Sequence, residues 1–377
     1  MNVVFVHDHK FRKVNNTIYS PGGLSNEILT RYTEIFGNVF VIGRIINEKK
    51  ARVTYSKITN PLVCIETKEM LFKRIKSADA VIIRLPSING YKAVYFAKKL
   101  KKPYLVEVVG CTKDAYLNYG IKGKIFAYPA YYLMKKCVYD SKYTIYVTKE
   151  FLEKRYPCKG KSAAISDVAL LPQSNKMEEK KNWKDIKGRK KLVLGTLASI
   201  DVSYKGQEYV IKAIPDIEKR IGVRLEYQLV GAGDSTRLLN IAQKYGVEDR
   251  IVFKGTLPHQ EVFQWLDSLD CYIQPSLVEG LSRALIEAMS RGIMCLASNC
   301  GGNPELLDPE CLIPIKDRDN IPDEIAKILS ELYLKEQYVF QSRRNYSIAN
   351  KYYNEDHLKQ LRVEFYSEFK EYAMYKG

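Results

Sequence analysis

Short apolar segments alternate with amphipathic helical segments along most of this 377-residue chain. The apolar segments are about four to seven residues long, which suits strands buried inside a sheet. Strands that alternate with helices in this way are typical of parallel sheets covered by helices on both faces. The sequence therefore predicts an α/β fold of two doubly wound, Rossmann-like domains, and an apolar fraction of 46% is enough for two cores.

The first domain is predicted at residues 1–172. Its strands are expected at residues 3–6, 39–42, 80–84, 104–109 and 143–147, and its helices at residues 24–36, 90–100 and 124–138. Residues 173–190 carry many charges without periodicity, so we interpret them as a linker.

The second domain is predicted at residues 191–353 and repeats the alternation. Its strands are expected at residues 192–195, 224–230, 251–253 and 271–277, and its helices at residues 207–220, 235–245, 259–269 and 282–291. Further helices are expected at residues 322–334, 336–352 and 356–374.

The segment E-G-L-S-R-A-L-I-E, residues 279–287, directly follows the last of these strands. It predicts a short loop and then a helix that Gly292 ends. A helix start preceded by Gly280 leaves backbone N–H groups unpaired, and such groups attract phosphate. Glu287 lies on a helix that is apolar on most of its circumference, so its carboxylate is expected to need a ligand hydroxyl or a backbone donor. The alternative is a surface helix with two solvated glutamates.

Two glycine turns add to this pattern. Gly22 and Gly23 precede a helix and follow the first strand after a predicted loop of about fifteen residues, so the backbone can approach a ligand there. Gly231 and Gly233 end a strand and predict a tight turn beside a nucleotide. Each turn is a weak signal alone, since most such sequences are ordinary turns.

Positive charge is concentrated in the first half of the chain. Residues 1–170 hold 30 Lys and Arg against 13 Asp and Glu, and residues 171–377 hold 30 against 30, so the net charge of +17 lies in the first part. Between Tyr119 and Lys161, ten basic residues interleave with tyrosines and Phe126. This mixture favours an anionic membrane surface as partner. The equally weighted alternative is a helix with core tyrosines and solvated lysines.

Glu279 and Glu287, continued by E-A-M-S-R-G and S-N-C-G-G-N-P-E-L-L, resemble the donor site of retaining GT-B glycosyltransferases of family four. The resemblance implies two domains facing a central cleft and a last helix, residues 354–377, that crosses back to the first domain. It implies that Glu279 contacts the donor sugar and Glu287 the ribose. The donor diphosphate and sugar are expected to be held by the loop and the helix start, which are formed by Gly280, Leu281, Ser282 and Arg283.

The same resemblance assigns the donor diphosphate to Lys205 and places Gly22 and Gly23 opposite it across the cleft. Lys205 and Glu279 are therefore the candidate catalytic residues. One departure is Thr196, which stands where family members often carry a phosphate-binding arginine. Either Arg283 or another cation replaces that arginine, or phosphate binding relies on backbone amides. No bound metal or other cofactor is expected.

Three residues of the first domain are candidates for the acceptor side. His9 lies in an H-D-H segment that has too few ligands for a metal site, so we interpret the segment as a polar loop. Glu107 ends a predicted strand and Asp114 follows it, and either carboxylate could order an acceptor hydroxyl. Surface or capping roles are equally consistent with these two residues.

The predicted function is transfer of a sugar from a nucleoside diphosphate to a hydroxyl of a lipid-linked or surface polysaccharide, with retention of anomeric configuration. UDP is the favoured nucleotide and GDP the second choice. Eight scattered cysteines and strand-sized apolar runs predict a cytoplasmic enzyme. The basic aromatic segment, residues 119–161, adds the hypothesis that the enzyme is peripheral at the inner face of the plasma membrane. A nucleotide-sugar epimerase on the same fold is the alternative. A basic nucleic-acid-binding protein is disfavoured because no recognisable module for it appears.

Overall fold

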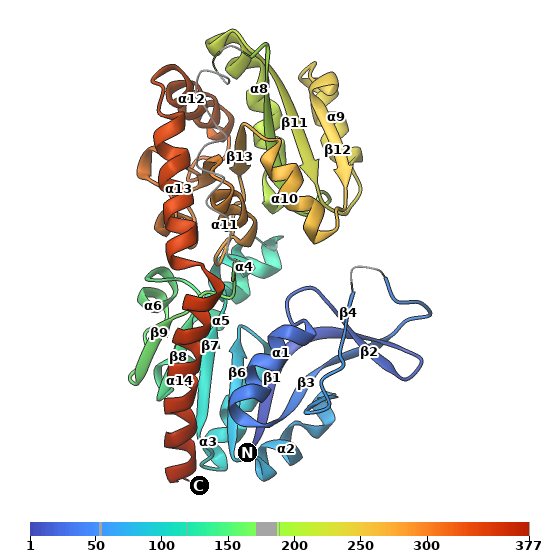
Figure 1. The fold of residues 1–377 in the computed structure, drawn as a ribbon, viewed down its shortest axis with the longest axis vertical. Coiled ribbons are helices and arrows are strands. Elements are labelled where there is room, and N and C mark those ends of the chain that lie inside the picture. Colours follow the sequence, from blue (N-terminus) through green and yellow to red (C-terminus); the bar gives the residue numbers. More distant parts are fainter. Residues whose placement is uncertain (53–54, 119, 171–186, 188, 377) are drawn as a thin grey trace. The chain divides into compact units, whose positions relative to one another are not determined.

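The computed structural model describes residues 1–52, 55–118, 120–170, 187 and 189–376. The chain forms two compact units: residues 1–165 with 359–377 make unit 1, and residues 166–358 make unit 2. Each unit is a sheet flanked by helices (Figure 1). The two Rossmann-like α/β domains expected from the sequence are therefore confirmed. The predicted linker at residues 173–190 lies almost entirely outside the described residues.

The parallel strands of unit 1 follow the order β5-β3-β1-β6-β7-β8-β9, and β2 and β4 extend the sheet as antiparallel strands. The strands are β1 (Asn2–Val14), β2 (Thr17–Pro21), β3 (Asn38–Asn47), β4 (Tyr55–Lys57), β5 (Val63–Glu66), β6 (Ala80–Leu85), β7 (Tyr104–Val108), β8 (Tyr143–Tyr146) and β9 (Lys161–Ala164). The helices are α1 (Asn26–Phe36), α2 (Leu71–Ser77), α3 (Ile88–Lys99), α4 (Thr112–Leu117), α5 (Gly120–Tyr139) and α6 (Phe151–Arg155).

The predicted loop after the first strand is wrong. β1 continues to Val14, turns at Asn15 and Asn16, and pairs antiparallel with β2. Asn15 has a φ of 53°, a left-handed conformation that asparagine tolerates better than most residues. Buried Phe11 stands between exposed or half-buried basic residues, so the strand alternation is present in the sequence. The strand was not predicted because a segment rich in basic residues is also typical of a solvated loop.

The sheet of unit 2 is entirely parallel, with the order β12-β11-β10-β13-β14-β15. The strands are β10 (Lys191–Leu197), β11 (Arg224–Val230), β12 (Ile251–Gly255), β13 (Cys271–Gln274), β14 (Met294–Ser298) and β15 (Leu312–Ile313). The helices are α8 (Gln207–Ile221), α9 (Thr236–Lys244), α10 (His259–Asp267), α11 (Arg283–Ser290), α12 (Ile321–Leu334) and α13 (Tyr338–Tyr352). The strand order reverses between β10 and β13, the position where open α/β sheets bind ligands.

The last helix, α14 (Glu355–Lys376), packs on unit 1 through most of its length. The ring of Tyr143 in β8 contacts Phe365, Phe369 and Tyr372. The Nζ of Lys370 donates to the carbonyl of Ile35 at 2.7 Å. Residues 359–377 are thus part of the N-terminal unit although they come last in the chain.

None of the helices in the described part of the chain is long and apolar enough to cross a membrane. All eight cysteines are free thiols, and five of them are buried.

Candidate active site

Glu279 and Lys205 meet at the point where the strand order of unit 2 reverses. Lys205 ends a 3-10 turn, Ser203–Lys205, that follows β10, and Glu279 lies in the loop after β13. The Lys205 Nζ donates to Glu279 Oε1 at 2.8 Å, and both side chains are largely shielded from solvent. The fold therefore brings the two predicted catalytic residues into contact, although they are 74 positions apart in the sequence.

Gly206 allows this approach. It has a φ of 74°, and a Cβ there would lie 2.0 Å from the carbonyl oxygen of Pro275. Any other residue would push the Lys205 turn away from the end of β13. The backbone N–H of Leu277 also donates to the carbonyl of Tyr204 at 2.8 Å, so backbone contact fixes the two loops to each other.

The small-residue loop after β14 packs against the Glu279 loop. Gly301 has a φ of 57°, and a Cβ there would lie 2.1 Å from the carbonyl oxygen of Glu279. The N–H of Gly302 donates to the carbonyl of Gly280 at 2.7 Å. Gly301 in S-N-C-G-G-N therefore has a structural cause, because only glycine lets this loop pack so closely against the Glu279 loop.

Helix α11 begins where the sequence predicts it. Ser282 is its N-cap, and its Oγ accepts the N–H of Leu285 at 3.4 Å. Leu281 precedes the cap and is half-buried, whereas Arg283 at the first helical position is exposed. The remaining N–H groups of the first turn are available to an anion.

Glu287 is buried in α11, with 6% of its surface exposed. His259, the first residue of α10, places its Nε2 3.5 Å from Glu287 Oε1. His259 was not among the predicted site residues, because its contact with Glu287 joins two different helices. Its position just after the end of β12 was the available signal, since this is the ligand-binding end of the sheet.

The pKa of His259 is raised above 6.5 by its hydrogen bond with Glu287, against the opposing effects of burial and of the Arg283 charge. A raised pKa in the folded state contributes stability that is fully present below the unfolded pKa and is lost as the pH rises through the folded pKa. We expect His259→Gln to lower the thermal midpoint at about pH 6 and to match the wild type at about pH 9. Thermal unfolding across this range measures it, and an equal deficit at every pH would contradict the pairing.

Thr196 has no free hydroxyl for a ligand. Its Oγ1 donates to the carbonyl of Ile273 at 2.6 Å and lies 2.7 Å from the hydroxyl of Tyr227, and the residue is fully buried. Its role is to join β10 to both neighbouring strands. A cation that replaces the expected arginine must therefore come from elsewhere.

Packing within unit 2 explains two of the other predicted donor-site glycines, Gly231 and Gly233, but not Gly22 and Gly23 of unit 1. A Cβ on Gly231 would lie 1.9 Å from the carbonyl oxygen of Ala198, and one on Gly233 would lie 2.7 Å from the amide nitrogen of Asp201. Both glycines therefore support the loop after β10. Gly22 and Gly23 lie between β2 and α1 in unit 1, are exposed, and have no atom near the Cβ position.

The acceptor candidates lie on three elements of unit 1, and each is already engaged. His9 is in β1 and not in a loop as predicted, and its Nε2 lies 2.8 Å from Ser20 Oγ. Burial, followed by the charges of Arg84 and Arg12, lowers the pKa of His9 to about 4, so its ring is neutral at physiological pH. Asp114 in α4 accepts from the guanidinium of Arg155 at 2.7 Å.

Glu107 is buried and takes part in a network of hydrogen bonds, so it lies neither on the surface nor in an exposed site. Its carboxylate accepts from the hydroxyls of Tyr366 at 2.6 Å and Tyr32 at 2.9 Å, and from Arg84 at 3.3 Å. Tyr366 lies on α14, so Glu107 fastens the last helix to the sheet of unit 1. These contacts favour a structural role over the predicted contact with an acceptor.

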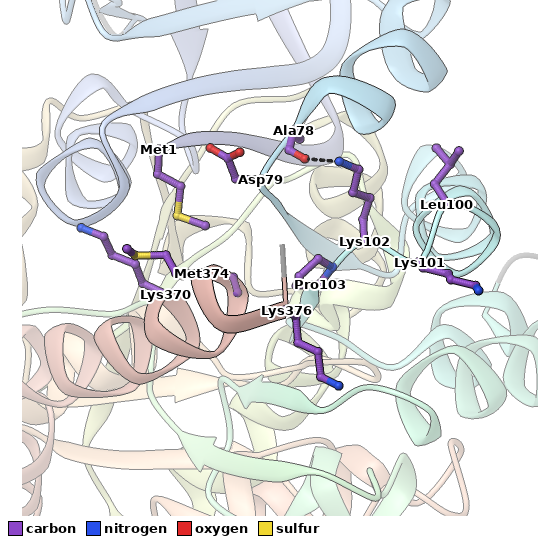
Figure 2. A pocket seen from close by; sticks show the side chains of 11 residues that line it. Met1, Ala78, Asp79, Leu100, Lys101, Lys102, Pro103, Lys370, Met374 and Lys376 are labelled. Atoms are coloured by element: carbon purple, nitrogen blue, oxygen red, sulfur yellow. Dashed lines mark hydrogen bonds between the residues drawn. The ribbon is translucent and has the colours of Figure 1, made fainter.

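A cavity of about 660 Å³ lies in unit 1, where strands β6 and β7 begin. Figure 2 shows Lys102 pointing to the carbonyl of Ala78, which it contacts at 2.7 Å, and lysines of α14 on the opposite wall. Lys101, Lys370 and Lys376 complete its basic rim. No predicted site residue lines this cavity, and it lies at the opposite end of the strands from the usual ligand site of such sheets.

Comparison with known proteins identifies the family. The model for glycosyl transferases group 1 matches residues 191–331. Protein CapJ of Staphylococcus aureus is 36% identical over 371 residues, which cover 93% of this chain and 92% of CapJ. The chain belongs to the glycosyl transferases group 1 family. This family membership supports the prediction that the chain is a glycosyltransferase. It does not favour the alternatives of an epimerase or a nucleic-acid-binding protein.

Two further likenesses agree with this family. The putative colanic acid biosynthesis glycosyltransferase WcaL of Escherichia coli K12 is 30% identical over 132 residues, about a third (32%) of each chain. The structure of Anabaena Alr3699/HepE in complex with UDP matches with a TM-score of 0.67 at 15% identity, covering 98% of this chain and 100% of that one. At this identity the likeness establishes the fold, which is that of GT-B glycosyltransferases.

Proposed function

We propose that this glycosyltransferase moves a sugar from a nucleoside diphosphate donor with retention of anomeric configuration, as enzymes of family four do. The observation that supports this most is the Lys205–Glu279 pair at the strand-order reversal, directly before the start of α11. The pair brings together a cation for phosphate, a carboxylate for sugar hydroxyls and open helix N–H groups.

In the proposed reaction, the bond between the anomeric carbon and the diphosphate oxygen breaks. The acceptor oxygen bonds to the same face of that carbon, and the departing phosphate takes the acceptor's proton. Lys205 and the N–H groups at the start of α11 stabilise the charge that develops on the phosphate. Glu279 orients the donor sugar, and Glu287 accepts hydrogen bonds from the ribose. Arg283 is the proposed second cation, because it is exposed at the start of α11.

UDP is the proposed nucleotide, supported by the UDP complex of the similarly folded Alr3699/HepE. GDP is the second choice. The proposed acceptor is a lipid-linked or surface polysaccharide, supported by the likeness to a colanic acid biosynthesis glycosyltransferase. A thermal-shift panel of UDP, GDP, ADP and their sugars tests the donor, since a ligand that binds the folded state raises the midpoint. A rise with UDP and UDP-sugars is expected, and no rise with any of the six would contradict the donor site.

Helix α5 supports a further proposal, that unit 1 docks on an anionic membrane from the cytoplasmic side. Ile121 is 81% exposed and Phe126 58%, and the side chains of Ile125, Tyr128 and Tyr132 are also more exposed than buried. Lys122 and Lys124 are exposed in the same turns. Apolar side chains beside lysines match the boundary between headgroups and acyl chains.

Two tyrosines of the basic segment, Tyr143 and Tyr146 in β8, do not contribute to this surface. Tyr146 is fully buried and donates to the carbonyl of Tyr156 at 2.7 Å, and Tyr143 packs on α14. Tyr119 lies outside the described residues. These strand tyrosines are therefore packing residues, as the alternative in the sequence prediction had it. The proposed membrane contact depends on the exposed side chains of α5.

We expect the wild type to cosediment with anionic vesicles and not with neutral ones, and to be released by salt, because lysine contacts of about 1 kcal/mol each are screened. Phe126→Glu should weaken this binding at least about tenfold, since a buried aromatic side chain is worth roughly 1.5 to 3 kcal/mol. Phe340→Glu on α13 is the matched control, because Phe340 is 59% exposed on unit 2. Equal losses in both variants would reject α5 as the docking helix.

A further inference from the structure

Strand β13 carries two polar side chains where a buried strand is expected to be apolar. Tyr272 is fully buried and Gln274 is 2% exposed, and both point to the same face because they are two residues apart. Burying an amide and a hydroxyl costs free energy unless their hydrogen bonds are made. Both groups make them, and the chain they form leads to Glu279.

The hydrogen bonds run in one direction. The N–H of Leu197 donates to the Tyr272 hydroxyl at 3.4 Å, and that hydroxyl donates to Gln274 Oε1 at 2.6 Å. The Gln274 Nε2 donates to Ser276 Oγ at 2.7 Å and to Glu279 Oε1 at 3.2 Å. An ionised carboxylate can only accept, so the amide nitrogen must face Glu279 and the amide oxygen must face Tyr272.

Both N–H donors of Gln274 are thus used within the protein, its oxygen accepts from Tyr272, and the side chain is buried, so we infer that its effect acts through Glu279. Oε1 of Glu279 accepts from both Gln274 and Lys205, whereas Oε2 has no protein partner among the described residues. Oε2 is thus the oxygen free to accept a hydroxyl of the sugar.

We propose that Gln274 is a positioning residue for sugar transfer, which holds Glu279 by Oε1 and presents Oε2 to the donor sugar. The inference rests on the proposed role of Glu279. A positioning role explains why Glu279 Oε1 accepts from the neutral Gln274 amide as well as from the Lys205 ammonium. Lys205 turns to the donor diphosphate when the donor binds, and Gln274 then keeps the carboxylate in place. Tyr272 in turn fixes the amide.

The test uses release of UDP from a UDP-sugar, with free UDP binding measured separately. Gln274→Leu should lower kcat by roughly tenfold, the effect of losing one hydrogen bond to a charged group, and leave the Kd for UDP unchanged. Tyr272→Phe keeps the ring and should shift kcat in the same direction by less. Gln228→Leu is the matched control, because Gln228 is a buried glutamine of β11 that accepts from Trp265 at 2.8 Å.

The pH dependence of kcat in Gln274→Glu separates a positioning role from a purely structural one. This substitution places a second carboxylate beside Glu279, and two such groups share a proton at low pH. Its kcat should therefore recover as the pH falls, whereas the wild type should show no such gain.

The inference is overturned if Gln274→Leu retains wild-type kcat, or if it loses no more than Gln228→Leu, while Glu279→Gln is inactive. Recovery of Gln274→Glu at low pH supports it. Full activity of Glu279→Gln would instead contradict the proposed role of Glu279 itself, and so separates the two failures.

Discussion

Glu279→Gln is expected to bind UDP as the wild type does and to lose sugar transfer by at least about 100-fold. The amide keeps the size of the side chain and removes the charge, and the loss of one group aimed at a transition state costs on the order of 100- to 1000-fold in kcat. Calorimetric titration with UDP measures binding, and UDP release from a UDP-sugar measures turnover.

The Lys205 contact makes this separation of binding from turnover informative. Lys205 donates to Glu279 in the structure, so a purely structural carboxylate would loosen the phosphate-binding turn when it is lost. Loss of UDP binding together with turnover would therefore assign Glu279 a structural role. Glu226→Gln is the matched control, because Glu226 is another half-buried glutamate of unit 2 that accepts from a lysine, Lys191, at 2.6 Å, and this variant should bind UDP and turn over as the wild type does.

Glu287→Ala is expected to weaken UDP binding by about 1.5 to 3 kcal/mol, or roughly 10- to 150-fold, because hydrogen bonds to a carboxylate are worth this much. Buried Glu287 has His259 beside it at 3.5 Å, so the ribose is the expected partner that completes the site. Titration of UDP into the folded variant gives the change in Kd.

Glu261→Ala is the control for this variant, since Glu261 is an exposed glutamate in the first turn of α10. It should bind UDP like the wild type. Unchanged affinity in Glu287→Ala would reject the assigned contact with the ribose.

The fold of unit 2 follows closely from local patterns in the sequence. Strand β11 has the predicted bounds, Arg224–Val230, and α8 and α12 differ from prediction by a single residue at one end. Clear periodicity and glycine stops such as Gly222 and Gly292 explain this agreement. In unit 1 the hairpin of β1 and β2 was missed, because its basic residues concealed the strand alternation.

The parts of the site that escaped prediction depend on contacts between distant residues. Glu107 was expected near an acceptor, but its partner Tyr366 is 259 positions away, and no local pattern reveals that contact. His259 and Glu287 meet only because α10 and α11 are neighbours in the folded unit. Gln274 stands in an apolar run, and its importance becomes visible only when Tyr272 and Glu279 are seen on either side of it.

The most direct test of the central claim is the configuration of the sugar that the enzyme releases. Proton NMR can follow the anomeric signal when the protein hydrolyses an α-linked UDP-sugar, with water in place of the acceptor. The proposed same-face displacement predicts that the α-anomer of the free sugar appears first, together with UDP. First appearance of the β-anomer, or conversion to a different sugar still attached to UDP, would contradict it.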